Sequence, residues 1–207
     1  MYFVKAIVVF TAIAIVARRS ARADHPFPTL GPANQVTMIR ALLVALTAAC
    51  IGEPATPAYS QAAAGAAAIA TGLDGVDGWL ARRTRMASPF GARFDMETDA
   101  LLILVLAILA WQHGKAGPWV LASGLLRYIF VAAGWLQPWM QRPLFPSLRR
   151  KTICIVQMAG LILTILPAIP PPASAQIAAA SLAALAYSFL VDTWWLWRRA
   201  TAVTRIN

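Results

Sequence analysis

Four aspartates at fixed spacing are the residues of this chain best suited to chemistry. Asp74 and Asp77 are three positions apart, and Asp95 and Asp99 are four positions apart. With Glu97 they make up five of the chain's eight acidic residues, although 59% of its 207 residues are hydrophobic. Ionisable groups near hydrocarbon are costly and usually functional. The cluster therefore needs a partner that neutralises its charge.

Divalent metal ions are the partner that this cluster predicts. Residues three or four apart share one face of a helix, so each pair presents both carboxylates on one side. Converging carboxylates that are partly withdrawn from water repel one another and are stabilised by hard cations, Mg²⁺ or Mn²⁺ where phosphates complete the coordination shell. Two divalent ions bridged by shared carboxylates suit an in-line phosphoryl displacement. We expect these ions to be held by Asp74, Asp77, Asp95 and Asp99, whereas Glu97 points away from the shared face.

Small and basic residues beside the aspartates fit a phosphate ligand. Gly78 and Gly91 lack side chains where a nucleotide or diphosphate would approach the backbone. Arg82 follows Asp77 by about one helical turn and is placed to meet phosphate oxygens. A structural alternative is that the aspartates only pair with the arginines around them. That alternative accounts for neither the glycines nor the spacing.

The composition predicts an all-α integral membrane protein. Mean hydropathy is +0.64 and only 13% of residues are charged, and a chain of this length has room for six or seven spans of about 20 residues. Its basic residues gather in alternate connections, as the positive-inside rule requires. The net charge of +10 therefore indicates anionic membrane lipids, and not nucleic acid, as its partner. The basic clusters are Arg18, Arg19 and Arg22; Arg82, Arg83, Arg85 and Arg93; Arg142, Arg149, Arg150 and Lys151; and Arg198, Arg199 and Arg205.

We expect a bundle of six transmembrane helices with an additional N-terminal hydrophobic helix. Residues 1–33 would form the N-terminal hydrophobic or interfacial helix, around 6–17, and a Pro/Gly-rich hinge at 25–32. Residues 34–207 would form the bundle, with the aspartates at the cytosolic ends of its second and third helices. Cys50 and Cys154 read as small core residues. The expected helices cover about 35–51, 59–82, 90–111, 118–136, 152–169 and 173–197.

The aspartate pattern resembles the signature of a known family, the CDP-alcohol phosphotransferases. The matching pattern is Asp77-Gly78-x₂-Ala81-Arg82-x₈-Gly91-x₃-Asp95-x₃-Asp99, preceded by Asp74. Asn34, Thr37 and Arg40 resemble the opening of the family's first helix. Lys151, Thr152 and Gln157 are similar to the start of the fifth helix in phosphatidylglycerolphosphate synthases.

The resemblance implies a metal-dependent phospholipid synthase. A CDP-linked lipid, usually CDP-diacylglycerol, would donate its phosphatidyl group to a small alcohol or alcohol phosphate, with release of CMP. The four aspartates would hold the ions, Asp99 would be the general base on the acceptor hydroxyl, and Asp95 would also be catalytic. The resemblance further implies a homodimer, and a bacterial inner-membrane location fits the arginine- and alanine-rich composition. The CDP pocket would be lined by Thr37, Gly78, Ala81, Arg82 and Gly91.

The sequence determines the acceptor less well than the CDP-lipid donor, and an acceptor like glycerol 3-phosphate is preferred. Arg127, within the expected helix 118–136, either binds an acceptor phosphate or pairs with a carboxylate or snorkels. Arg149 and Lys151 either bind the acceptor or only set membrane orientation. Arg40 either is a counter-ion of the acidic cluster, which is preferred, or snorkels.

A membrane carrier of ions or solutes is the alternative function. Carriers bind their cargo near the bilayer midplane, at broken helices in two pseudo-symmetric halves. The chain shows no internal repeat, and the aspartates are expected near the cytosolic surface, so the synthase interpretation is preferred.

Overall fold

The protein is an all-helical bundle. The computed structural model describes residues 1–24, 27, 29–142, 144, 145 and 147–204, and no strand occurs among them. Residues 25, 26 and 28 of the expected hinge, and Arg205, lie outside the described residues. The elements are α1 (Tyr2–Asp24), α2 (Gly31–Ala49), α3 (Pro57–Thr84), α4 (Pro89–Gln112), η1 (Pro118–Leu121), α5 (Ala122–Leu136), η2 (Pro138–Gln141), α6 (Leu148–Ile165) and α7 (Ala173–Thr204).

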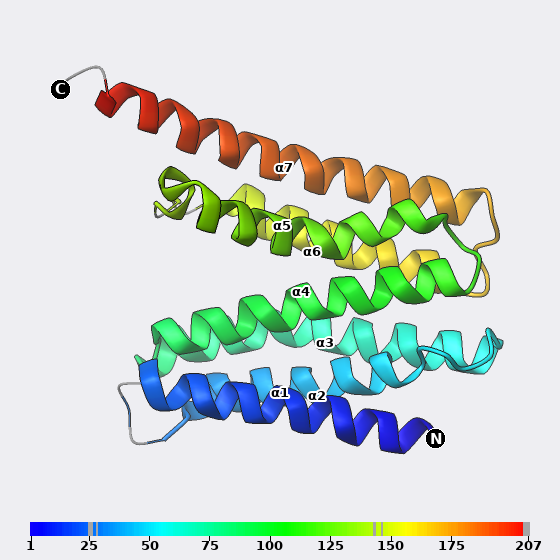
Figure 1. Cartoon of the computed structure of the whole chain (residues 1–207). Coiled ribbons are helices and arrows are strands. Elements are labelled where there is room, and N and C mark those ends of the chain that lie inside the picture. The colour runs from blue at the N-terminus through cyan, green and yellow to red at the C-terminus, as the bar shows by residue number, and fades with distance from the viewer. Residues whose placement is uncertain (25–26, 28, 143, 146, 205–207) are drawn as a thin grey trace.

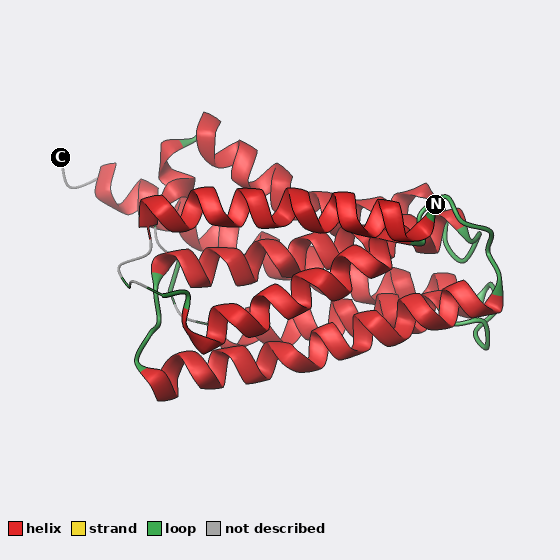
Figure 2. Ribbon diagram, turned by 90° about the horizontal axis from the view of Figure 1, so that it is seen from below, coloured by secondary structure: helices red, strands yellow, loops and turns green. Residues whose placement is uncertain are grey.

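Successive long helices run side by side in opposite directions (Figures 1 and 2). The connections α3–α4 and α5–α6, the C-terminal end of α1 and the C-terminal end of α7 all lie at one end of the bundle (Figure 1). Those segments carry the clustered arginines, so we call this the arginine-rich end. Lys5 and Lys115 are at the opposite end, where Lys5 pairs with Glu53 at 2.7 Å. The predicted alternation of charge is therefore present in the fold.

Small residues let the helices approach closely. Ala41 and Ala45 of α2 and Ala67 and Ala70 of α3 are buried to within 1%. This packing fits the alanine-rich composition of α3, since small side chains permit close helix contact in membranes. A Cβ at Gly124 of α5 would lie only 2.6 Å from the Cα of Leu104 on α4. Glycine is therefore required at that crossing.

Several helices are longer than their apolar runs predicted. α1 extends well beyond 6–17 and packs through Ala17 against Phe90 and Phe94 of α4. α2 begins at Gly31, inside the expected hinge, and α6 begins at Leu148 instead of at 152. The apolar windows missed these turns because charged and polar residues continue a helix into an interface. Helix 118–136 is a 3₁₀ turn followed by α5, and not one α-helix.

Two segments, Pro118–Leu136 and Ala173–Thr201, are long and apolar enough to cross a membrane. The expected count of six spans is therefore not established by helix length and composition. Large apolar side chains nevertheless face outward on every long helix, for example Ile7, Ile39, Ile69 and Ile129. Apolar surface of this extent is usually covered by lipid or a partner.

Candidate active site

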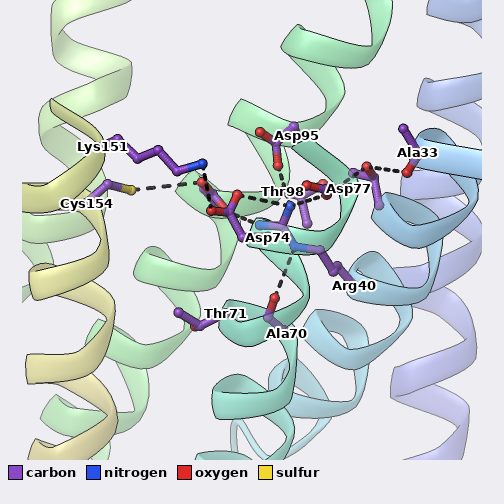
Figure 3. Close-up of polar contacts among 12 residues, drawn as sticks. Ala33, Arg40, Ala70, Thr71, Asp74, Asp77, Asp95, Thr98, Lys151 and Cys154 are labelled. Carbon is purple, nitrogen blue, oxygen red and sulfur yellow. Dashed lines mark hydrogen bonds and ion pairs between the residues drawn. The ribbon is translucent and has the colours of Figure 1, made fainter. Parts of the chain in front are cut away.

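The four aspartates converge inside the arginine-rich half of the bundle. Asp74 and Asp77 come from α3, and Asp95 and Asp99 come from α4, with Arg40 of α2 between them (Figure 3). Asp74, Asp95 and Asp99 can each offer an oxygen that lies within 4.8 Å of the others. Their carboxylates could thus share a metal ion. Asp99 lies ten positions after Pro89, so it is about 15 Å along α4 from the start of that helix.

Arg40 is the central cation of the acidic cluster. Its side chain is 1% exposed, and Nη1 lies 2.6 Å from Asp77 Oδ2 and 3.4 Å from Asp74 Oδ1. Nη1 also pairs with Asp95, Nη2 pairs with Asp99, and Nε donates to the carbonyl of Ala70 at 3.1 Å. The expectation that Arg40 is a counter-ion is confirmed.

Asp77 differs from the other three aspartates. Its Oδ2 accepts hydrogen bonds from Arg40 and from the hydroxyl of Thr37 at 3.1 Å. Both donors lie on α2, so Asp77 joins α2 to α3 and stands outside the group of three carboxylates. Binding of metal by all four aspartates stays a prediction. Thr37, expected in the CDP pocket, is buried and contacts Asp77 instead of an open cavity.

The described contacts leave the cluster short of positive charge. Besides Arg40, Lys151 of α6 lies 3.6 Å from Asp74 Oδ2, with a half-exposed side chain. Two cations thus face four carboxylates among the described residues. Uncompensated buried charge is strongly unfavourable, and hard oxygen donors of this kind prefer Mg²⁺ or Mn²⁺. The donor set and its charge therefore fit the expected divalent ions.

The short turn between α3 and α4 fixes the register of the two aspartate pairs. Arg85 ends α3 with a left-handed φ of 55°, and Ser88 caps α4 by accepting a hydrogen bond from the backbone N–H of Gly91 at 3.0 Å. Pro89 occupies the first turn of α4, where its missing N–H costs nothing. These caps set where each helix ends, and hence which face carries its carboxylates.

The structure gives a reason for a glycine at position 91 that the sequence did not indicate. A Cβ at this position would lie 2.7 Å from Asn34 Oδ1 and 3.3 Å from Ser88 Oγ. A larger residue would have to displace the Asn34 side chain, so glycine favours the close approach of α4 to α2. Its expected role beside a nucleotide stays a prediction.

A cavity of about 710 Å³ opens beside the carboxylates. Asp74, Asp95 and Asp99 form an acidic part of its lining, and Arg127, Arg150 and Lys151 form a basic part. Cys154 also lines it, with Sγ 3.9 Å from Asp99 Oδ2. Cys154 is partly buried and packs against the core as well as bordering this cavity, whereas Cys50 is buried in the core. The apolar part of the lining includes Ile103, Phe130, Met158 and Phe189.

Arg127 faces this cavity and pairs with an acidic residue outside the cluster. Its Nη2 pairs with Glu97, and its Nη1 lies 2.8 Å from the sulfur of Met96. Its Nε is buried and makes no hydrogen bond to any described residue. Glu97, which was left out of the predicted metal site, is indeed directed elsewhere. Arg127 thus faces the cavity, and its partner Glu97 is not one of the four site carboxylates. Its expected role in acceptor binding stays a prediction.

Arg149 contacts α7, whereas its neighbour Arg150 lines the cavity. Arg149 donates to the carbonyl and hydroxyl of Ser188, at 2.8 and 2.7 Å, and pairs with Asp192. Arg149 is absent from the lining of the 710 Å³ cavity, and its expected role in acceptor binding stays a prediction. Arg150 lines the cavity in its place, and its Nη1 is buried, makes no hydrogen bond to a described residue and lies 3.8 Å from Asp192 Oδ2.

The sequence contained a signal for Arg150 that a misplaced helix start concealed. Arg150, Cys154 and Met158 are spaced by four, so they share a face once α6 begins at Leu148. The prediction began this helix at 152 and left residues 149–151 in a loop, where no face can be assigned.

Comparison with known proteins identifies the family of this chain. Residues 30–198 match the family model of the CDP-alcohol phosphatidyltransferases. The chain belongs to this family. It is also similar to the CDP-diacylglycerol–glycerol-3-phosphate 3-phosphatidyltransferase of Pseudomonas fluorescens, with 35% identity over 109 residues, which are 52% of this chain and 54% of that protein. The chain thus matches only about half the length of this relative. No solved structure gives a significant match.

The remaining residues of the phosphatidyltransferase signature lie towards the arginine-rich end. Gly78, Ala81 and Arg82 are on the last turns of α3, and they do not line the 710 Å³ cavity. A Cβ at Gly78 would meet only the end of the Arg82 side chain, at 3.5 Å. Arg82 is exposed. Their assignment to a CDP pocket stays a prediction for this family member.

Proposed function

We propose that this protein transfers the phosphatidyl group of a CDP-linked lipid, CDP-diacylglycerol, to the hydroxyl of a small alcohol phosphate such as glycerol 3-phosphate. CMP is the second product. The proposal is carried by one observation: three carboxylates within 4.8 Å of one another adjoin a cavity that also has a basic lining. Membership of the CDP-alcohol phosphatidyltransferase family supports it, and the relative from Pseudomonas fluorescens is named for this acceptor.

Charge supports a site for two divalent ions and a diphosphate. Four carboxylates, Arg40 and Lys151 together carry two net negative charges. Two divalent ions would leave two positive charges, which the diphosphate of a CDP-lipid would balance. Asp74, Asp95 and Asp99 would hold the ions, and Asp77, whose Oδ2 is bound by Arg40 and Thr37, would join them through its other carboxylate oxygen. When bound, the ions would polarise the diphosphate and stabilise the charge on the departing CMP.

Asp99 is the proposed general base. Its carboxylate lines the cavity, so it can accept the proton of an acceptor hydroxyl there. The hydroxyl oxygen then forms a bond to the lipid-side phosphorus, and the bond from that phosphorus to the CMP oxygen breaks. Asp95 lies beside Asp99 on the same face and shares Arg40 with it. Positioning and charge neutralisation provide most of the catalysis in such a site.

The basic part of the cavity is the proposed acceptor site. Arg150 and Lys151 stand in the first turn of α6, where the positive end of the helix makes cations unfavourable without an anion. A phosphate at this N-terminus would be bound by helix and side chains together. Arg127 is the third proposed contact. Arg149, for which the sequence left acceptor binding and membrane orientation as alternatives, contacts Ser188 and so joins α6 to α7.

The membrane arrangement follows from the arginine-rich end. We propose that α2 to α7 are the six spans, that this end faces the cytosol of a bacterium across its inner membrane, and that the CDP-lipid enters from the inner leaflet. Thr37, Gly78, Ala81, Arg82 and Gly91 keep their proposed place in the CDP pocket. The structure contains one chain, and the homodimer stays a prediction.

The carrier alternative is not favoured. Carriers of ions or solutes typically bind at broken helices, whereas α3 and α4 continue unbroken past all four aspartates.

The test is CMP release by the purified, folded protein. CDP-diacylglycerol is supplied with Mg²⁺ or Mn²⁺ and, in turn, glycerol 3-phosphate, glycerol, serine, inositol and inositol phosphate. Release should require a metal and one acceptor, and should be lost in Asp99→Asn. Glu53→Gln, at the opposite end of the bundle, is the matched carboxylate-to-amide control and should stay active. No release with any acceptor or metal would contradict the proposal.

A further inference from the structure

A second cavity of about 500 Å³ lies between α1, α4 and α5, away from the aspartates. We call it the α1 groove. α1 contributes one stripe to its lining, and α4 contributes most of the rest. The lining residues are Ala12, Ile13, Val16, Ala17 and Ser20 of α1, Phe90, Arg93, Phe94, Glu97, Thr98 and Leu101 of α4, and Tyr128 of α5.

Small side chains on α1 create this groove. Ala12 and Ser20 leave space beside the parallel rings of Phe90 and Phe94, whose centroids are 5.8 Å apart, while Ala17 packs against these rings. From Phe90 to Leu101 the groove follows eleven residues of α4, which is about 16 Å. Apart from its polar end, the lining is mainly apolar, so it has the shape and chemistry for a hydrocarbon chain.

One end of the groove is positively charged. Ser20 and Arg93 line it at the arginine-rich end of the bundle, and Arg18 and Arg19 are exposed on the adjoining turn of α1. Glu97, the acidic residue of the lining, is paired with Arg127. Because Arg18 and Arg19 are exposed beside this end, a ligand with an apolar chain that ends in a negative charge complements the groove.

We infer that the α1 groove binds one anionic phospholipid, with an acyl chain along Ala12, Val16 and Phe94 and its phosphate beside Arg93. The inference rests on the membrane placement proposed above, and it concerns a site separate from the reaction. α1 lies outside residues 30–198, the part that matches the family. Five of the twelve lining residues are therefore contributed by a segment that the family model does not include.

The bound lipid packs against the helix that carries two catalytic aspartates. Phe94 and Thr98 face the α1 groove, whereas Asp95 and Asp99, the next residue in each case, face Arg40. Occupancy would therefore hold α1 and α4 together at the level of the active site. The expected consequence is greater thermal stability with anionic lipid.

The test counts phospholipids bound to the purified full-length protein by native mass spectrometry. Phosphatidylglycerol and phosphatidylcholine with identical acyl chains are added in parallel, and the melting temperature is measured with each. Ala12→Trp fills the groove from an exposed helix position, and Val16→Trp does so from a second one. Ile15→Trp adds the same ring at an exposed position that does not line the groove, and is the control.

Wild type and Ile15→Trp should retain one more phosphatidylglycerol than Ala12→Trp and Val16→Trp, and should be stabilised more by phosphatidylglycerol than by phosphatidylcholine. Arg93→Gln should remove the preference between the two headgroups. Equal phosphatidylglycerol counts in wild type and both groove-filling variants would overturn the inference. Equal retention of the two lipids by wild type would overturn the anionic headgroup. Because the readout is binding, failure of CMP release would leave these results interpretable.

Discussion

The guanidinium of Arg40 on α2 lies 2.6 Å from the carboxylate of Asp77 on α3, and this contact joins the two helices at the centre of the acidic cluster. The same guanidinium pairs with Asp95 and Asp99 on α4. One buried cation thus ties three helices together. Since four carboxylates surround it, the site depends on Arg40 for folding and on further cations for charge balance.

Replacing Arg40 should make folding depend on divalent metal. Arg40→Gln leaves the carboxylates facing one another, and removing one member of a buried ion pair costs about 3–5 kcal/mol. We expect a large loss of thermal stability in EDTA, partly recovered by millimolar Mg²⁺. Lys5→Gln, which removes a pair at the opposite end, is the control and should show little response to metal. Equal responses of the two variants to Mg²⁺ would contradict this role of Arg40.

Asp74 and Asp77 should differ in their effect on metal use. Asp74→Asn removes a member of the three-carboxylate group, so the Mg²⁺ concentration for half-maximal CMP release should rise by about tenfold or more. Asp77→Asn should lower stability more than it changes this concentration, because Asp77 is held by Arg40 and Thr37. Thr37→Val tests the second contact without changing charge. If both asparagine variants shift the Mg²⁺ requirement equally, Asp77 is a metal ligand like the others.

Arg149 and Arg150 form a matched pair for the acceptor site. Arg150→Gln should raise KM for glycerol 3-phosphate about tenfold or more, because a charge-assisted hydrogen bond contributes about 1.5–3 kcal/mol. KM for CDP-diacylglycerol should stay the same. Arg149→Gln should lower the melting temperature and leave the acceptor KM unchanged, since its partners are Ser188 and Asp192. The reverse pattern would return acceptor binding to Arg149.

Gly91 and Asn34 should be energetically coupled. Gly91→Ala places a Cβ 2.7 Å from Asn34 Oδ1, and overpacking of this kind costs about 1–3 kcal/mol. In the double variant Gly91→Ala/Asn34→Ala, the shorter side chain at position 34 leaves room for the new Cβ, so part of the lost stability should be recovered. The coupling is measured as a double-mutant cycle in thermal unfolding. Absence of recovery, together with a raised KM for CDP-diacylglycerol, would favour direct contact between Gly91 and the nucleotide.

The sequence by itself determined the helical class, the alternation of charge and the convergence of two aspartate pairs. These features are local. Spacings of three and four place Asp74 with Asp77, and Asp95 with Asp99, on single helix faces whatever the rest of the chain does. The arginines mark alternate connections for an equally local reason. Even the role of Arg40 was expected, because a buried cation needs anions and the chain has one dense group of them.

The tertiary structure decided how those faces meet. Whether Arg149 or Arg150 reaches the cavity depends on where α6 begins and on its rotation about its own axis. Side chains of consecutive helical residues differ in direction by about 100° around that axis. That Asp77 bonds to Thr37, that Gly91 makes room for Asn34, and that Cys154 approaches Asp99 all depend on contacts between helices distant in sequence. No local spacing encodes such contacts, because each is fixed by the packing of the whole bundle.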